Sequence, residues 1–288
     1  MTTKVAWRRV LYEQQQYPDN YVDSNKFLDQ LQLSSPVVTV PISDILLAAS
    51  TIAEEISAMS LFLTVYKYIV TPGSVVVPTL ELDICLLLLG YIIHWVFDHG
   101  VVADLSSTFR YLIVYGGYLR VIAPILQSLT SSYSEDTIDA CSLFFTVVHL
   151  LFQDYAFINN SSGKFSGTLS LNAAMFTAVL LASRLESTQK VSAFMLLAVI
   201  LFCLLPHTIR MVKKKAVWVH ISMTMILWGI VSYLLFNLDR TLLFAYEIVV
   251  IFFAVVCPFW MQFIGSKYKK SLRGPWDIAQ VPETGKED

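Results

Sequence analysis

The chain has 288 residues and a formal net charge of −2 at pH 7; 56% of its residues are hydrophobic and 15% are charged. Soluble globular domains are about 45–50% apolar and about 25% charged, so this composition excludes a soluble globule and indicates an integral membrane protein. Most of the 20 Lys and Arg residues lie in a few short tracts, and they form no basic stripe of the kind that binds nucleic acid.

Residues 1–43 are predicted to form a polar arm outside the bilayer. Pro18 followed by Asp19 and Asn20 favours a turn, and the aromatic residues around this turn suit a membrane interface. A flexible polar tail is the alternative that composition leaves open. No apolar run of signal-peptide length occurs here, so the first membrane helix is expected to act as the targeting signal.

About eight apolar stretches follow, each near the length of about 20 residues that crosses the hydrocarbon core. They are roughly 45–70, 78–97, 109–129, 136–158, 168–185, 190–206, 216–236 and 241–264. Their short connections predict an all-α fold, a polytopic membrane helical bundle at 44–265 followed by a tail at 266–288. The first stretch is the weakest, because Glu54 and Glu55 fall near its middle, where an unpartnered carboxylate costs at least about 2.5–3.5 kcal/mol. Part of it is therefore expected at the interface.

The distribution of Lys and Arg predicts the orientation of this bundle. With eight spans both termini lie on one side of the membrane, and 15 of the 20 basic residues fall on that side. Positively charged loops stay in the cytoplasm, so both termini and the flanking arm and tail are predicted to be cytoplasmic.

The stretch at 168–185 carries small residues at every fourth position. Ser170, Ala174, Ala178 and Ala182 fall in one line on a helix, which allows another backbone to approach closely. We predict that Ala174, Ala178 and Ala182 form a helix-packing face. The alternative is a spanning helix with incidental alanines.

A polar stripe runs along the stretch at 136–158. Its members, spaced three and four residues apart, are Asp139, Ser142, Thr146, His149 and Gln153. That spacing puts them on one helical face, which must look into the bundle. Two roles are open: hydrogen bonds between helices, or contact with a ligand.

Residues that suit recognition of a lipid headgroup gather on the predicted cytoplasmic side. The tract at 210–215 is predicted to be a basic loop, which either sets the topology or binds an anionic headgroup. Polar residues near the end of the fourth span and the start of the fifth are neighbours across a short loop. The lipid-acceptor candidates are His149, Asp154, Ser170, Asn172, Arg210, Lys213, Lys214 and Lys215.

Signals for metals and cofactors are weak. His94 and Asp98 are one helical turn apart, and with His99 they superficially resemble a histidine box, but only five histidines are present and no second box exists. The four cysteines lie singly in apolar runs. No glycine-rich phosphate loop or nucleophile elbow is present, so we predict no metal, no cofactor and no catalytic residue in this chain.

Several short motifs follow one another along the chain. They are Leu11-Tyr12-Glu13 with Tyr17 to Asp23, Asp136 to Ala140, His149 with Asp154-Tyr155, Ser166 to Asn172, Leu181 to Leu185 and Gly274 to Asp277. Taken together and in order, these motifs resemble the PIG-C family, which provides one of the subunits of phosphatidylinositol N-acetylglucosaminyltransferase. The resemblance covers nearly the whole chain and fades in the loops between the motifs.

This resemblance implies membership of the endoplasmic-reticulum complex that transfers N-acetylglucosamine from UDP-N-acetylglucosamine to phosphatidylinositol, the first step of GPI-anchor biosynthesis. It also implies that the glycosyltransferase site belongs to a partner subunit. The expected role is then a scaffold that positions the lipid acceptor. The alternative is a lipid scramblase or small-molecule transporter, because buried polar residues also mark translocation paths.

Overall fold

The structure is a computed structural model that describes residues 14, 15, 17, 40–71, 79–97, 105–129 and 133–268. Every regular element in these residues is a helix, in agreement with the predicted all-α fold. Residues 41–261 form one compact unit, and residues 1–40 and 262–288 belong to a second. Most of the predicted arm and tail lie outside the described residues.

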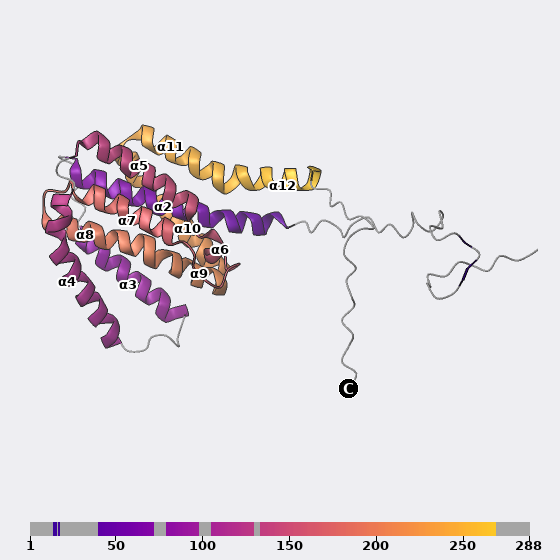
Figure 1. Cartoon of the computed structure of the whole chain (residues 1–288), viewed down its shortest axis with the longest axis horizontal. Coiled ribbons are helices and arrows are strands. Elements are labelled where there is room, and N and C mark those ends of the chain that lie inside the picture. Colours follow the sequence, from indigo (N-terminus) through magenta and orange to yellow (C-terminus); the bar gives the residue numbers. More distant parts are fainter. Residues whose placement is uncertain are drawn as a thin grey trace, which may run out of the picture. The chain divides into compact units, whose positions relative to one another are not determined.

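Figure 1 shows the helices of the bundle, with α2 passing between its neighbours. In chain order they are α2 (Ile42–Val70), α3 (Thr79–Phe97), α4 (Leu105–Leu129), α5 (Glu135–Phe152), α6 (Tyr155–Ile158), α7 (Thr168–Ala182), α8 (Thr188–Val199), η1 (Ile200–Leu204), α9 (Leu205–Lys215), α10 (Val217–Leu238), α11 (Arg240–Ile251), η2 (Phe252–Val256) and α12 (Cys257–Tyr268). The two η segments are single turns of π-helix.

Five of the described helices are long and apolar enough to cross a bilayer. They are Ile42–Val70, Leu80–Phe97, Thr188–Lys215, Val217–Leu238 and Arg240–Gly265. These match five of the stretches that the sequence predicts. Two shorter apolar helical stretches, Gly116–Leu126 and Thr168–Ala182, lie within the predicted third and fifth spans.

The predicted fourth span is not one continuous helix. Residues 153 and 154 leave the helical conformation, so α5 ends at Phe152 and α6 begins at Tyr155. The Asp154 side chain accepts a hydrogen bond from the backbone N–H of Phe157, which caps α6, and an aspartate that bonds its own backbone in this way competes with helix formation. The Tyr155 hydroxyl donates to the carbonyl of Leu150, one of the groups that the end of α5 leaves free.

The basic tract at 210–215 is likewise not a loop. It forms the last turns of one uninterrupted helix of 28 residues, Thr188–Lys215, that comprises α8, η1 and α9. Proline explains the π-helical turn inside it. Pro206 has no N–H and its ring clashes with the preceding turn, and the helix widens just before it at η1. The segment η2 stands in the same relation to Pro258.

The core of the unit lies between α2, α7 and α8. Phe62 of α2 is fully buried and stacks on Phe194 of α8, with ring centroids 4.3 Å apart. On α7 the small residues form part of the same interior: Ser170, Ala174, Ala178 and Ala182 are each 0% exposed. The helix packs most extensively against α5 and also contacts α8.

Candidate functional site

Two adjacent acidic residues lie in the middle of α2. Glu54 is 2% exposed and Glu55 is 1% exposed, so the middle of α2 lies inside the bundle and both carboxyl groups are enclosed by protein. Successive residues on a helix point about 100° apart, and the two carboxyl groups therefore meet different neighbours. Glu54 faces α10, and Glu55 faces α5.

His149 on α5 connects Glu55 with the start of α7. Its Nε2 lies 3.8 Å from Oε2 of Glu55, and its Nδ1 lies 2.8 Å from the hydroxyl and 3.1 Å from the carbonyl oxygen of Ser170. The Ser170 hydroxyl is also 2.8 Å from Oε1 of Gln153, to which it donates. All four side chains are buried, so this series of polar contacts links α2, α5 and α7 inside the bundle.

His220 on α10 has the matching role for Glu54. Its Nδ1 lies 3.4 Å from Oε2 of Glu54, and its Nε2 lies 2.8 Å from the hydroxyl of Ser50. The Ser50 hydroxyl donates to the carbonyl of Leu47, so it accepts from His220. Thr224 donates to the other Glu54 oxygen at 2.9 Å. These contacts link α2 to α10.

Both acid–histidine pairs require a proton. The Ser170 carbonyl and the Ser50 hydroxyl each accept from one ring nitrogen, so a neutral imidazole presents its bare nitrogen to the carboxyl group. Those two ring nitrogens, and the Glu54 and Glu55 oxygens that face them, have no hydrogen-bond partner among the described residues. One proton per pair, on the acid or on the imidazole, removes the clash between two acceptors and leaves no unpaired buried charge.

Lys213 connects the end of α9 with α2. The side chain is 8% exposed, and Nζ donates to the carbonyl of Leu47 at 2.6 Å and to Oδ1 of Asn159 at 2.5 Å. Thr51 donates to the same Asn159 oxygen at 3.4 Å. The lysine charge is therefore directed inward, where it holds three segments together.

Arg210 packs on the outside of α6. Its Nη1 donates to the carbonyl of Phe157 at 3.1 Å, and its Cζ lies 3.8 Å from the centre of the Phe157 ring, within the range of a cation–π contact. The amide of Asn160 donates to the Arg210 carbonyl at 3.4 Å. We call the end of the bundle formed by residues 153–170 and 205–215 the rim.

Asp154 holds the loop of the rim together. Its two carboxyl oxygens accept from the N–H of Phe157 at 2.9 Å, and from the N–H and hydroxyl of Ser166 at 2.7 and 2.8 Å. Desolvation acts to raise the pKa of this carboxyl, but the three hydrogen bonds and the nearby Arg210 outweigh it and hold the pKa below its ordinary value. Asp154 is thus an ionised structural clamp.

The sequence as a whole identifies the family. A family profile described as phosphatidylinositol N-acetylglucosaminyltransferase, GPI2, matches residues 7–277. A Dictyostelium discoideum protein named as the C subunit of this enzyme is 33% identical over 276 residues, which cover 96% of this chain and 79% of the relative. The chain belongs to the GPI2 family. The Homo sapiens C subunit is 27% identical over 98% of this chain and 95% of its own length, and the GPI2 subunit of Schizosaccharomyces pombe is 26% identical over 98% and 88%. No solved structure matches the chain.

In this GPI2-family chain the predicted lipid-acceptor candidates divide into three groups. Some are interior: His149 and Ser170 contact each other, and Lys213 is directed inward. Others have structural contacts at the rim, since Asp154 clamps its loop and Lys215 donates to the carbonyl of Phe97. The remainder, which face outward at least in part, are Asn172, Arg210 and Lys214.

The polar stripe of α5 faces the interior of the bundle, as its spacing predicts, with one exception. Four of its members are buried, namely Ser142, Thr146, His149 and Gln153, whereas Asp139 is exposed. Sequence reasoning missed His220, Asn159 and the two glutamates as members of the interior network. A signal did exist, because two acids in an apolar span need buried partners, and His149 and His220 both lie in predicted spans.

A metal centre finds no support in the part of the chain that the structure describes. No group of three or more His, Cys, Asp and Glu side chains there is arranged to hold a metal ion. His94 instead lies 3.5 Å from the hydroxyl of Thr208, and Asp98 and His99 fall outside the described residues. The described cysteines are free thiols.

Proposed function

We propose that this chain is a membrane subunit of the endoplasmic-reticulum complex that transfers N-acetylglucosamine from UDP-N-acetylglucosamine to phosphatidylinositol. Its role in that reaction is to scaffold the catalytic subunit and to position the lipid acceptor at the rim. The chemistry belongs to a partner. Positioning an acceptor contributes to rate without any reacting group on the positioning subunit.

Membership of the GPI2 family supports the reaction, since the relatives are named as subunits of phosphatidylinositol N-acetylglucosaminyltransferase. The observation that carries the positioning role is the rim itself. It is rigidly built, by the Asp154 clamp and the inward Lys213, yet it leaves Arg210 and Lys214 facing outward. An anionic acceptor needs a fixed cationic surface of this kind at the membrane interface.

For the topology we propose eight spans with the rim and both termini in the cytoplasm. Beyond the five long helices, the other three are α4, α5 and α7. At 15 residues α7 is about 22 Å long, which is shorter than the hydrocarbon core. Most of its inward face is buried in protein, and a short helix with polar ends is tolerated there. On this topology residues 1–43 and 266–288 are the cytoplasmic arm and tail.

A lipid scramblase or small-molecule transporter is the second candidate function. Buried ionisable side chains of the bundle, among them Glu54, Glu55, His149 and His220, favour it, because such groups also mark paths for polar substrates. The two functions differ in what they require of partners. A scramblase acts alone in vesicles, whereas an acceptor-positioning subunit needs the catalytic chain.

Purification of the tagged chain in a mild detergent, with identification of the proteins and lipids that accompany it, tests the proposal. The expected result is a glycosyltransferase subunit together with enriched phosphatidylinositol, and loss of transferase activity from membranes that lack this chain. Recovery of the chain alone, with lipid scrambling in vesicles and normal transferase activity in its absence, would establish the rival function instead.

A further inference from the structure

The outer face of α9 carries two cations that make no ion pair with the described residues. Arg210 and Lys214 are four positions apart, which places them together on one side of the helix. Lys214 is exposed and Arg210 half-buried, whereas Lys213, between them in the sequence, is buried. Burial and side-chain contacts, and not position around the helix, therefore separate the outward pair from the inward Lys213 and from Lys215, which donates to Phe97.

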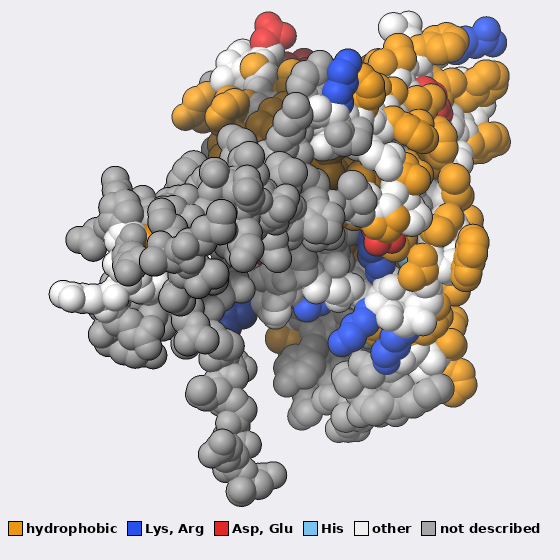
Figure 2. Space-filling model, turned by 90° about the vertical axis from the view of Figure 1, so that its right-hand side faces the viewer, with side chains coloured by type: hydrophobic (Ala, Val, Ile, Leu, Met, Phe, Trp, Pro, Cys, Tyr) orange, Lys and Arg blue, Asp and Glu red, His pale blue; other side chains and the backbone are white. Residues whose placement is uncertain are grey.

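This pair lies near the level of the lipid headgroups in the proposed topology. The helix from Thr188 to Lys215 has 28 residues, and at 1.5 Å per residue it is about 42 Å long, against about 30 Å for the hydrocarbon core. Four of its five Lys and Arg residues follow Pro206, so part of the excess length falls in the last turns. Figure 2 looks onto this end of the unit, and Lys and Arg side chains gather in the lower part of that view.

The guanidinium of Arg210 is held in place without any ligand. Its hydrogen bond to the Phe157 carbonyl and its position above the Phe157 ring fix the plane of the group. The nearby carboxylate of Asp154 attracts the guanidinium but accepts its hydrogen bonds from Ser166 and Phe157, and no ion pair joins the two among the described residues. Arginine has five N–H donors, and a group fixed in advance loses less entropy when it binds.

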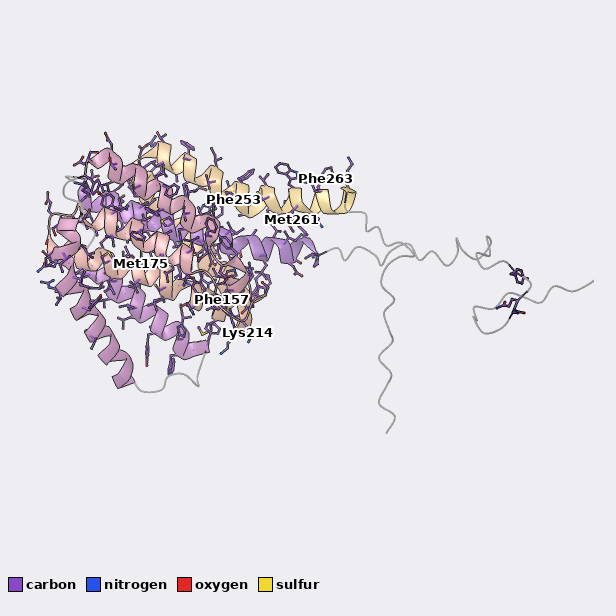
Figure 3. All side chains as sticks on the ribbon, in the orientation of Figure 1. Phe157, Met175, Lys214, Phe253, Met261 and Phe263 are labelled. Atoms are coloured by element: carbon purple, nitrogen blue, oxygen red, sulfur yellow. The ribbon has the colours of Figure 1, made fainter. Side chains whose placement is uncertain are left out.

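Lys214 lies at the same end as this arginine. Figure 3 labels Lys214 and Phe157 close together at the end of the bundle, and the helices that carry them, α9 and α6, contact each other. A planar guanidinium binds two oxygens of a phosphate at once, and a flexible ammonium adds a point charge from the side. The two side chains thus complement one phosphate group.

We propose that Arg210 and Lys214 bind the phosphodiester of the inositol phospholipid acceptor. This deepens the function proposed above and rests on it. Lys213 has no part in the contact, because its ammonium is engaged with Leu47 and Asn159. The outward pair is therefore the phosphate contact, and the inward lysine maintains the shape of the rim.

The test uses the complex with its partner subunits, reconstituted in vesicles. The variants are Arg210→Gln, Lys214→Gln and the double variant. Lys190→Gln is the matched control, because Lys190 is an exposed lysine at the other end of the same long helix. Lys213→Gln is the structural control. Transfer is measured against phosphatidylinositol concentration, and binding of a labelled short-chain phosphatidylinositol is measured in competition with glycerophosphoinositol and with inorganic phosphate.

We expect the apparent KM for phosphatidylinositol to rise about 5-fold for each outward charge removed and about 30-fold for the double variant, with kcat unchanged and the effect smaller at high salt. Lys190→Gln should leave KM unchanged. Lys213→Gln should lower the thermal midpoint, and any effect that it has on KM should not become smaller at high salt. Glycerophosphoinositol should displace the labelled lipid at concentrations where inorganic phosphate does not.

A wild-type KM in the double variant, in a complex that assembles and transfers sugar, would overturn this assignment while the proposed function stands. Equal displacement by inorganic phosphate would also overturn it, since the pair would then be a free-phosphate site. Failure of the proposed function is a different result: transfer by the partner subunits without this chain at all.

Discussion

Nε2 of His149 lies 3.8 Å from Oε2 of Glu55, and each of the two side chains is only 1% exposed. The residues come from α5 and α2, which are distant in the sequence. A buried carboxyl group without a partner costs several kcal/mol, so this pair determines how α5 can pack against α2. The pair of Glu54 and His220 does the same for α10.

Removing one member of such a pair should be far more damaging than neutralising it. We expect Glu55→Ala to lower the free energy of unfolding by about 3 kcal/mol or more, since it leaves a cavity and an unpaired His149 nitrogen. Glu55→Gln keeps a donor that can face Nε2, so it should cost clearly less. Thermal unfolding of the purified protein in detergent measures both. Equal losses of stability in the two variants would mean that the Glu55 side chain contributes only by filling space.

The fully buried Ala178 predicts a steric effect on α7. Ala178→Leu should lower the yield of assembled protein and its thermal midpoint, because overpacking a close helix contact costs about 1–3 kcal/mol. Ala245→Leu on the exposed side of α11 is the matched control and should be tolerated. If the two variants behave alike in size-exclusion chromatography after heating, the α7 contact has no special need for small residues.

The Asp154 clamp predicts a dependence on acid. Its pKa in the folded protein lies below the ordinary value of 3.8, so its stabilising contribution is complete only above about pH 5 and is lost as the pH falls through the folded pKa. Asp154→Asn should have a lower thermal midpoint at pH 7 and a smaller further loss between pH 5 and pH 3 than the wild type. Parallel curves for the two proteins across that range would contradict the clamp.

The proposed orientation predicts that no glycan is attached at the rim. Asn159 and Asn160 both stand in formal acceptor sequences, but a cytoplasmic loop is not glycosylated. Endoglycosidase treatment should leave the mobility of the protein unchanged. The control variant is Ser161→Ala/Ser162→Ala, which removes both acceptor sequences without touching the Asn159 contact to Lys213. A glycan that disappears in this variant would invert the topology.

Much of the architecture follows from local properties of the sequence. Composition alone excludes a soluble globule, and apolar length predicts the five long helices, because crossing a bilayer requires only enough consecutive apolar residues. The fourfold spacing of α7 and the spacing of the α5 stripe likewise predict which faces turn inward. Helical periodicity is a local property, so it can be recognised in the sequence without knowledge of the partner helices.

Other features depended on which segments meet in space. The break at Asp154 arises because its side chain caps α6 at Phe157 and also binds Ser166 across the loop, and no apolar pattern reports such contacts. The basic tract resembles a loop by composition, yet it is helical because Lys213 reaches an oxygen on α2 and another at Asn159. Charged residues alone do not say whether a helix ends before them.

The class of the protein, the approximate positions of its helices and its family can all be read from the linear chain, since each depends on residue type and order. The partners of Glu54 and Glu55 cannot, and neither can the choice of which of four neighbouring cations face outward. Both depend on contacts between α2, α5, α6, α9 and α10, and a side chain's partner is set by packing between segments that lie far apart along the chain.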